Sequence, residues 1–233
     1  MKIFSILPFL LICQIGFAQR TTFSVGLNSG ISRFSGASAH GTTSLTIGGS
    51  FCHCESQAAS SLGNLPAATV GASAIVQREF KSHFVVSLEA GYEILRTRIK
   101  VDQYQLDDMI VKTDGVNITR HQFVNAFPSA GYNFRLNETL NLTVTGGIDL
   151  GFGLKSSSRT TIPDFSENLY TDQDNLVQKV DHRARIQAKL DGKRLGFTAS
   201  YAHGTRNWLN GWAGGPTDLH MRVWRVGVQY RIF

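Results

Sequence analysis

The sequence predicts an all-β protein, an eight-stranded antiparallel up-and-down β-barrel that crosses a membrane. Three features of the 233-residue chain support this prediction. Apolar residues recur at every second position in eight segments, which is the period of a strand with one apolar face. Short and long connections alternate between these segments, and an apolar stretch that resembles an export signal opens the chain.

The predicted strands occupy the chain after this stretch and leave no room for a second domain. The clearest is 140–154, where large apolar residues alternate with asparagine, threonine, aspartate and glycine. Segment 121–134 contains the run of about 11 residues that a tilted transmembrane strand requires. In chain order the predicted strands are 21–32, 66–79, 83–95, 121–134, 140–154, 183–190, 195–204 and 222–233.

Connection lengths alternate with a regularity that a soluble β-sandwich does not need. Long connections are expected at 34–65, 100–116, 156–176 and 205–218, and tight turns at 79–82, 135–139 and 191–194. Outer-membrane barrels have short periplasmic turns and long extracellular loops. The first long connection is rich in Gly, Ser and Ala, so its composition is that of a solvated or disordered segment.

The polar faces of the strands favour a membrane barrel over a soluble barrel or sandwich, which the same period also fits. Gly, Ser, Thr and Asn predominate there, and small side chains suit a narrow lumen. Charges of both signs are expected to pair across this lumen: Glu89, Glu93, Asp149, Arg183, Arg185, Lys189, Arg225 and Arg231. Aromatic residues near strand ends fit two interfacial girdles: Tyr92, Tyr132, Phe134, Tyr201, Trp224 and Tyr230.

The first eighteen residues are predicted to be a secretory signal that is cleaved after Ala18, which leaves 19–233 as the barrel domain. An exported barrel of this kind is expected in the bacterial outer membrane. The formal net charge is +6, but Lys and Arg are scattered along the strands rather than gathered in one patch. No nucleic-acid partner is therefore predicted.

The last strand, "RVWRVGVQYRIF", resembles the assembly signal of outer-membrane barrels. The residues that carry the resemblance are Arg225, Gly227, Tyr230, Ile232 and Phe233. The mature chain resembles small eight-stranded barrels of the OmpA transmembrane or OmpX type, and its "FAQ" and "YRIF" segments are similar to those of small Bacteroidota barrels. The resemblance implies two kinds of partner, namely the barrel-assembly machinery during biogenesis and the lipid and lipopolysaccharide of the outer membrane.

The two cysteines of the mature chain, Cys52 and Cys54, lie in the first long connection. Three states remain open for them: free or locally paired thiols, a disulfide that closes a very small strained ring, and a metal site that also uses His53 and His40. Closed zinc sites want four ligands at wider spacings, so no metal is predicted. No cofactor is predicted either.

No catalytic site is predicted from the sequence. Ser129 and Ser200 have inward parity, but the nearest histidine to Ser200, His203, has the parity of the lipid face. His83 and His121 point inward near strand ends without an identifiable partner, so both are interpreted as polar wall residues. Phosphate-binding and nucleophile motifs are missing from the sequence, and we expect a protein that is not an enzyme.

The function is expected in the extracellular loops, because eight strands enclose a space that side chains can fill. Trp208, Leu209 and Trp212 lie in the last long connection, either as contacts for another outer-membrane or surface protein or as a plug folded into the barrel mouth. The sequence therefore predicts a structural or interaction protein, such as an accessory subunit of a larger export or uptake complex. The alternatives are a narrow transport pore and a lipid-modifying enzyme.

Overall fold

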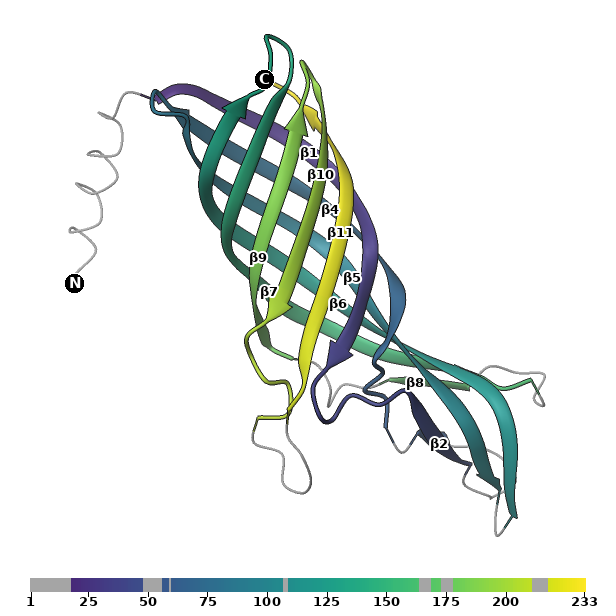
Figure 1. Ribbon diagram of the computed structural model, residues 1–233. Coiled ribbons are helices and arrows are strands. Elements are labelled where there is room, and N and C mark those ends of the chain that lie inside the picture. The colour runs from purple at the N-terminus through teal and green to yellow at the C-terminus, as the bar shows by residue number, and fades with distance from the viewer. Residues whose placement is uncertain are drawn as a thin grey trace.

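The computed structural model describes residues 18–47, 56–58, 60–106, 109–163, 169–172, 178–210 and 218–233 (Figure 1). The regular elements in these ranges are strands, and they contain no helix that is long and apolar enough to span a bilayer. The strands are β1 (Ala18–Ser35), β2 (Thr42–Ile47), β3 (Ser56–Ala58), β4 (Leu65–Phe80), β5 (Phe84–Leu106), β6 (Met109–Arg135), β7 (Asn141–Thr161), β8 (Leu169–Asp172), β9 (Val180–Asp191), β10 (Leu195–Gly204) and β11 (His220–Arg231).

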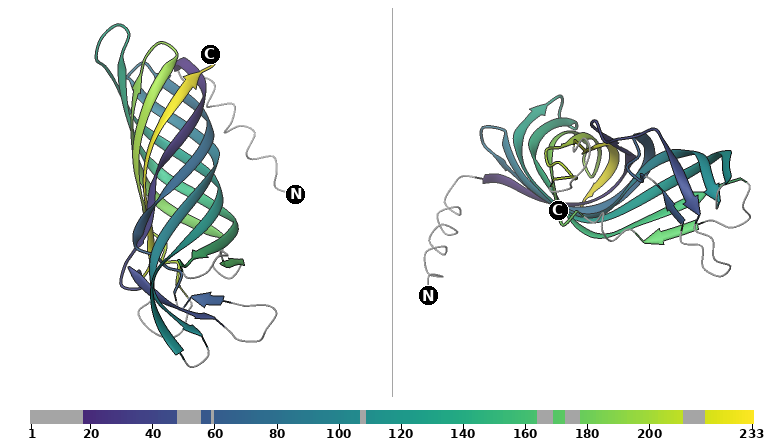
Figure 2. Two further views of the ribbon diagram at one scale, coloured as in Figure 1. Left: turned by 90° about the vertical axis from the view of Figure 1, so that its right-hand side faces the viewer. Right: turned by 90° about the horizontal axis from the view of Figure 1, so that it is seen from below.

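Eight of these strands close into a ring in the order β1, β4, β5, β6, β7, β9, β10, β11. Each is antiparallel to its neighbours, and β1 pairs with β11 to complete the circuit. Figures 1 and 2 show the tilted strands winding around one axis. The predicted eight-stranded up-and-down barrel is confirmed.

The C-terminal residues pair with β1 at the periplasmic side of the barrel, which carries the short turns. The Ile232 amide donates a hydrogen bond to the Phe23 carbonyl at 2.8 Å, and the Phe23 amide donates to the Phe233 carbonyl at 3.0 Å. The rings of Phe23 and Phe233 stack with centroids 5.7 Å apart. Because first and last strands pair, the sheet presents no free edge within the bilayer, where unpaired backbone groups are very costly.

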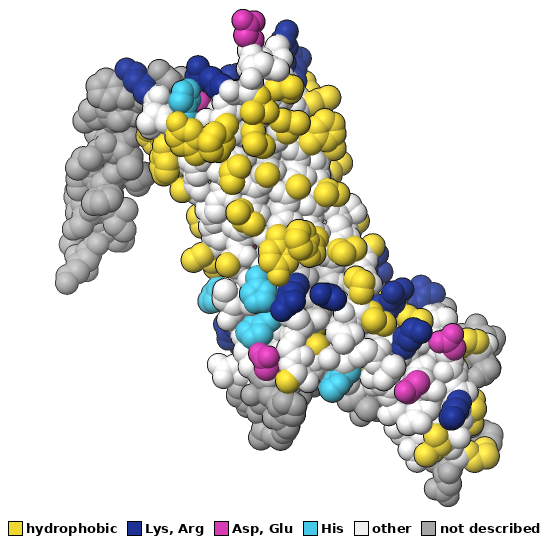
Figure 3. Space-filling view, in the orientation of Figure 1, with side chains coloured by type: hydrophobic (Ala, Val, Ile, Leu, Met, Phe, Trp, Pro, Cys, Tyr) yellow, Lys and Arg dark blue, Asp and Glu magenta, His cyan; other side chains and the backbone are white. Residues whose placement is uncertain are grey.

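The two faces of the barrel wall have opposite polarity. Outward side chains are apolar and exposed, including Leu27 at 71%, Val226 at 63% and Phe197 at 61%, and they form the hydrophobic band of Figure 3. Inward side chains are polar and buried, and both Asp149 and Arg183 are fully inaccessible. This arrangement is the reverse of a soluble barrel and places the apolar face in lipid.

Inward-facing glycines let neighbouring strands approach closely. A Cβ atom on Gly131 would lie 1.9 Å from the Val144 carbonyl oxygen, and one on Gly147 would lie 2.2 Å from the Pro128 carbonyl oxygen. The adjacent outward residue, Gly146, has open space at its Cβ position. Glycine is thus sterically required on the inner side of β6 and β7, where the wall of a small barrel bends sharply.

Three strands continue beyond the barrel at its extracellular end, which carries the long connections. β5 and β6 pair along their whole lengths to Leu106 and Met109, so the loop expected at 100–116 was wrong for most of its length. β2 runs parallel to β5, β3 pairs with β2, and β8 pairs with β7. We call β2, β3, β8 and the distal parts of β5 to β7 the extracellular sheet, which leans to one side of the barrel axis in Figure 2.

The extracellular sheet has a small apolar core of its own. Leu45, Val101, Tyr104 and Ile162 are buried together, with Val111 packed against them. Leu45 comes from β2, Val101 and Tyr104 come from β5, Val111 comes from β6, and Ile162 follows β7. The core therefore forms only when these segments pair, and no single segment predicts it. The sequence-based expectation of a disordered first connection was wrong for 34–47 and 60–65, because these residues form β2 and backbone hydrogen bonds such as Phe34 N to Gly63 O at 3.1 Å.

Candidate functional site

A buried cluster of charges crosses the middle of the lumen, and we call it the lumen charge cluster. Its members come from four strands of the ring: Glu93 on β5, Asp149 on β7, Asp181 and Arg183 on β9, and Arg225 on β11. Arg225 binds both oxygens of Glu93 through Nε and Nη2 at 2.8–3.0 Å, and its Nη2 also lies 3.0 Å from Asp149 Oδ2.

Arg183 is the second cation of the lumen charge cluster. Its Nη1 lies 2.6 Å from Glu93 Oε1, and its Nε lies 3.4 Å from Asp149 Oδ2 and 3.6 Å from Asp181 Oδ2. The guanidinium also lies over the Phe123 ring, with its Cζ 5.6 Å from the ring centroid. A Cβ atom on Gly151 would come within 2.8 Å of Arg183 Nη2, so this glycine makes room for the buried cation.

The other predicted lumen charges pair closer to the periplasmic end. Arg185 Nη2 lies 3.1 Å from Glu89 Oε2 and donates to Gln187, while its Cζ lies 4.2 Å from the centroid of the Phe127 ring. Lys189 Nζ lies 3.0 Å from Asp191 Oδ2, and Arg231 Nη2 lies 3.7 Å from Asp191 Oδ1. The structure therefore brings all eight predicted network residues to the lumen side and gives each an oppositely charged partner.

Two carboxylates that the sequence analysis did not single out complete this arrangement. Asp181 and Asp191 lie on β9 with the same parity as Arg183 and Lys189. The alternation that identifies the two cations as inward-facing therefore also identifies these two acids as inward-facing. Their partners are not readable from the alternation, because strand register across the lumen decides which charges meet. Asp181 contacts Arg183 and Asp191 contacts both Lys189 and Arg231.

The extracellular mouth of the barrel is filled by Trp208 and Leu209, which we call the mouth plug. Both side chains are buried, and they pack with Phe34, Phe123 and Leu219, which lie on or beside three barrel strands. The Trp208 indole donates from Nε1 to Asp181 Oδ1 at 3.1 Å, which joins the plug to the lumen charge cluster. Of the two placements expected for these residues, the structure shows the plug; Trp212 lies outside the described residues.

The remaining polar groups of the mouth show no complete catalytic arrangement. His121 is buried and its Nδ1 lies 3.0 Å from the hydroxyl of Ser156. The sequence analysis missed this partner because it placed Ser156 in a loop at 156–176, whereas β7 continues to Thr161. Trp208 covers this pair, with ring centroids 5.0 Å apart, and His121 Nε2 has no hydrogen-bond partner among the described residues. Among the described residues, the pair thus has no orienting acid, which a nucleophile and its base need.

His83 and Ser129, two other catalytic candidates, contact ordinary polar neighbours. His83 lies in the turn between β4 and β5 with a φ of 63°, and its Nδ1 is 3.3 Å from Glu79. The Ser129 hydroxyl is 2.7 Å from the Ser87 hydroxyl. The described part of the chain contains no group of three or more His, Cys, Asp or Glu residues placed to hold a metal ion. Cys52 and Cys54 lie outside the described residues.

The hollows beside the charges differ in size, and the widest polar one, about 490 Å³, lies at the periplasmic end and is lined by residues that include Glu79, Asn133 and Asn141. A hollow lined by Glu89, Glu93, Arg185 and Arg225 has a volume of about 10 Å³, and one near the periplasmic end, beside Asp191, has about 20 Å³. A cavity needs about 10–15 Å³ to hold a single water molecule. The two small hollows are therefore large enough for isolated waters only.

Residues 17–210 match the model described as "Outer membrane protein beta-barrel domain", which is most of the chain. The chain belongs to this outer-membrane β-barrel family. The barrel is accordingly an outer-membrane protein, as the export signal, strand period and closing strand predicted.

Known structures with a similar arrangement are small barrels of the same membrane. Ail, the attachment invasion locus protein of Yersinia pestis, is 14% identical, with a TM-score of 0.35, over 91% of this chain and 97% of Ail. Neisserial surface protein A is 11% identical, with a TM-score of 0.38, over 91% of this chain and 99% of that protein. No curated protein matches the sequence. Likenesses at this level carry no argument about function.

In this outer-membrane barrel, the residues of the predicted assembly signal lie on the last strand and just after it. Tyr230 points outward and is 44% exposed, and Ile232 and Phe233 are also exposed at the periplasmic end. Gly227 lies close to the Leu27 carbonyl and the Thr198 hydroxyl, since a Cβ atom there would be 2.7 and 2.8 Å from their oxygens. Arg225 belongs to the lumen charge cluster, and its recognition role during assembly stays a prediction.

Proposed function

We propose that this barrel is a non-enzymatic interaction protein that presents its extracellular sheet to another outer-membrane or surface protein. The main support for this proposal is the extracellular sheet. It continues from β5, β6 and β7 past the bilayer and has a buried core at Leu45, Val101 and Ile162. A solvated loop needs no such core. Ordered structure that projects from a rigid scaffold is typical of a recognition surface.

Exposed apolar residues at the end of the sheet support the same proposal. Met109 and Ile110 are 63% and 66% exposed, and they begin β6 at the tip of the long hairpin. These side chains lie beyond the barrel and have no lipid to face. Adjacent apolar residues of this kind on a projecting tip are typical of contact sites, and methionine adapts well to different partner surfaces.

The filled lumen favours an interaction role over transport. The lumen charge cluster crosses the barrel, and the mouth plug lies above it. A partner that binds the extracellular sheet would use the barrel as an anchor, so the protein would act as an accessory subunit of a larger outer-membrane complex.

The test is photo-crosslinking in intact cells. A photoreactive amino acid is introduced at Met109 or Ile110, and a control is introduced at Thr139, which is equally exposed but lies in the periplasmic turn between β6 and β7. We expect adducts of one discrete mass from the two tip positions and not from Thr139. The adduct formed at Ile110 should disappear when Met109→Asp is added, with the barrel still folded. Tip positions that give no adduct, or the same adducts as Thr139, would contradict the proposal.

A further inference from the structure

Two arginines and two histidines gather on the outward face of the barrel at its extracellular edge, and we call them the edge cluster. They are Arg33 on β1, His203 on β10, and His220 and Arg222 on β11. Register places Arg222 directly between the other two strands, with Arg33 and His203 as its cross-strand partners. Figure 3 shows Arg, Lys and His side chains bordering the hydrophobic band on this face.

The two arginines of the edge cluster have no ion pair to a carboxylate among the described residues. Arg33 and Arg222 are direct cross-strand partners, and like charges in that position destabilise a sheet. Arg222 Nε and His220 Nδ1 have no hydrogen-bond partner among the described residues. Asp218 Oδ1 lies 2.9 Å from His220 Nε2, and no described carboxylate forms an ion pair with Arg33 or Arg222. An anion between the arginines would relieve this repulsion.

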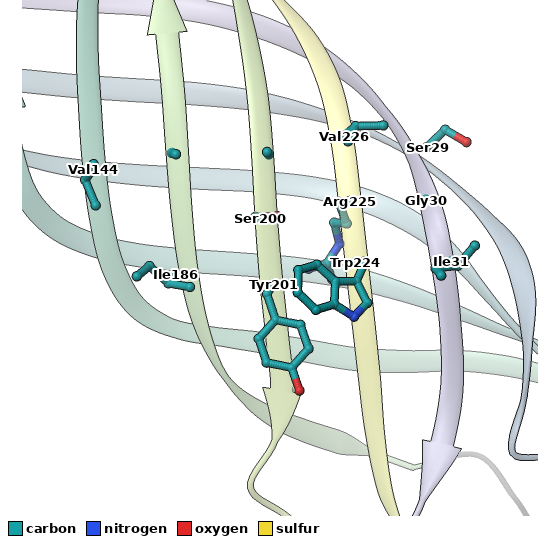
Figure 4. A pocket seen from close by; sticks show the side chains of 12 residues that line it. Ser29, Gly30, Ile31, Val144, Ile186, Ser200, Tyr201, Trp224, Arg225 and Val226 are labelled. Atoms are coloured by element: carbon teal, nitrogen blue, oxygen red, sulfur yellow. The ribbon is translucent and has the colours of Figure 1, made fainter.

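The hydrophobic band directly below the edge cluster is hollowed. Ala188 on β9 and Ala199 on β10 are cross-strand partners and line the hollow between larger side chains, which include Ile186, Tyr201 and Trp224. Figure 4 shows Tyr201 and Trp224 side by side at this hollow, and their ring centroids are 4.4 Å apart. Its volume is about 560 Å³, and ligand sites commonly have about 300–1,000 Å³.

The cations and the hollow are in register along the same strands. Arg222 and His203 each lie two residues beyond Trp224 and Tyr201, so about 7 Å of strand separates the charged row from the aromatic row. The Tyr201 hydroxyl lies 3.4 Å from His203 Nδ1, which links the two rows. An occupant therefore needs an anionic group at the membrane surface and an apolar chain that enters the bilayer just beneath it.

We propose that this face binds one phosphorylated, acylated glycolipid of the outer leaflet. Its phosphate would lie between Arg33, Arg222 and His203, and one acyl chain would occupy the hollow over Ala188 and Ala199. Basic clusters beside membrane-spanning segments recognise lipid headgroups by charge, and the apolar hollow adds a requirement that a free phosphate does not meet. The proposal depends on the barrel being in the outer membrane and not on the extracellular sheet having a partner.

The opposite side of the barrel provides a control. Arg96 and Arg120 are cross-strand partners on β5 and β6, and β6 is the strand farthest from β11 around the ring. The hollow of 560 Å³ includes no residue of β5 or β6. If charge alone retained lipid, Arg120 and Arg222 would contribute equally.

The test is native mass spectrometry of the full-length barrel extracted from outer membranes in mild detergent. We expect the wild-type protein to carry one phosphorylated glycolipid. Arg33→Gln and Arg222→Gln should each lower its occupancy about fivefold, given about 1 kcal/mol for one basic residue at a charged membrane surface. Ala199→Phe fills the hollow with an apolar side chain and should lower occupancy to a similar degree, while Arg120→Gln should leave it unchanged.

Heat-modifiable gel mobility confirms in each case that the variant barrel is folded. Equal loss from Arg120→Gln and Arg222→Gln would overturn the proposal, because it would indicate unspecific attraction at the edge. Unchanged occupancy in Ala199→Phe would overturn the acyl-chain part and indicate a phosphate contact alone. Crosslinking of Ala199→Cys to itself in native membranes would identify a second copy of the chain as the occupant and would also overturn the proposal.

Discussion

Replacing Arg225 with methionine tests whether the lumen charge cluster stabilises the barrel. Arg225 is 4% exposed and makes a bidentate contact with Glu93 and a further contact with Asp149, at 2.8–3.0 Å. Its removal leaves Arg183 as the one cluster cation against three carboxylates. Breaking a buried ion pair from one side costs about 3–5 kcal/mol, because the remaining charge is uncompensated. We therefore expect Arg225→Met to lower the free energy of unfolding by that amount.

A second substitution separates this electrostatic effect from a simple packing defect. In Arg225→Met with Glu93→Met, one charge of each sign is removed, and Arg183 keeps its contacts with Asp149 and Asp181 at 3.4 and 3.6 Å. The double variant should lose less stability than the sum of the two single variants, by about 1–3 kcal/mol for residues in one network. A packing defect would give additive losses.

The assay is equilibrium urea unfolding of the refolded barrel in lipid vesicles, followed by tryptophan fluorescence. Trp208 reports on the lumen, since its indole contacts Asp181. Lys193→Met is the control, because Lys193 is exposed in the turn between β9 and β10 and lies outside the lumen; it should change stability by less than about 0.5 kcal/mol. A loss below about 1 kcal/mol for Arg225→Met, together with additivity in the double variant, would refute the reasoning.

Three further substitutions have definite expected outcomes. Gly147→Ala should abolish most refolding, measured by gel mobility, whereas Gly146→Ala should not, because only the former places a Cβ 2.2 Å from a carbonyl oxygen; equal yields would contradict this. Tyr230→Asp or deletion of Phe233 should reduce outer-membrane levels in cell fractions while Tyr230→Phe does not, and normal levels of both defective variants would refute the assembly role. Trp208→Ala should lower the free energy of unfolding by about 3–5 kcal/mol. It should not make planar bilayers conduct ions, because the lumen charge cluster still fills the lumen. A wild-type barrel that conducts ions would contradict this second expectation.

The transmembrane part of the fold was predictable because it depends on a local pattern. In 140–154 the environment alternates between lipid and lumen at every residue, and the sequence alternates with it. The same alternation identified the inward charges, including Arg183 and Arg225. The closing pair of strands was predictable too, since a barrel in lipid must pair its first strand with its last.

The extracellular sheet was not predictable by the same rule, because its surroundings do not alternate between lipid and a polar lumen. Around Tyr104 the chain reads "DQYQL", with polar residues on both sides of the one aromatic, and the segment looks like a loop. It is a strand because β2 and β6 supply partners on both edges. Pairing between segments that are distant in sequence does not require apolar and polar residues to alternate within either segment.

Charge partners were equally hidden from the sequence. Alternation places a side chain inside or outside, but it does not set the height of one strand relative to another across the lumen. Asp181 meets Arg183 by its position on the same strand, whereas Glu93 reaches Arg183 and Arg225 only through closure of the ring. The position of Trp208 depends on the same closure, since the mouth that receives it is formed by several strands.

The last strand shows how one alternation produces two different electrostatic situations. Arg225 and Arg222 are three residues apart, so they lie on opposite faces of β11. Arg225 is held by Glu93 and Asp149 inside the barrel, where a bare charge would be very costly. Arg222 lies at the water-facing limit of the hydrophobic band, opposite another arginine and without an ion pair to any described carboxylate. The barrel compensates its inner arginine with its own carboxylates, whereas the described residues give the outer one no ion-pair partner, and this difference is the basis of the proposed lipid site.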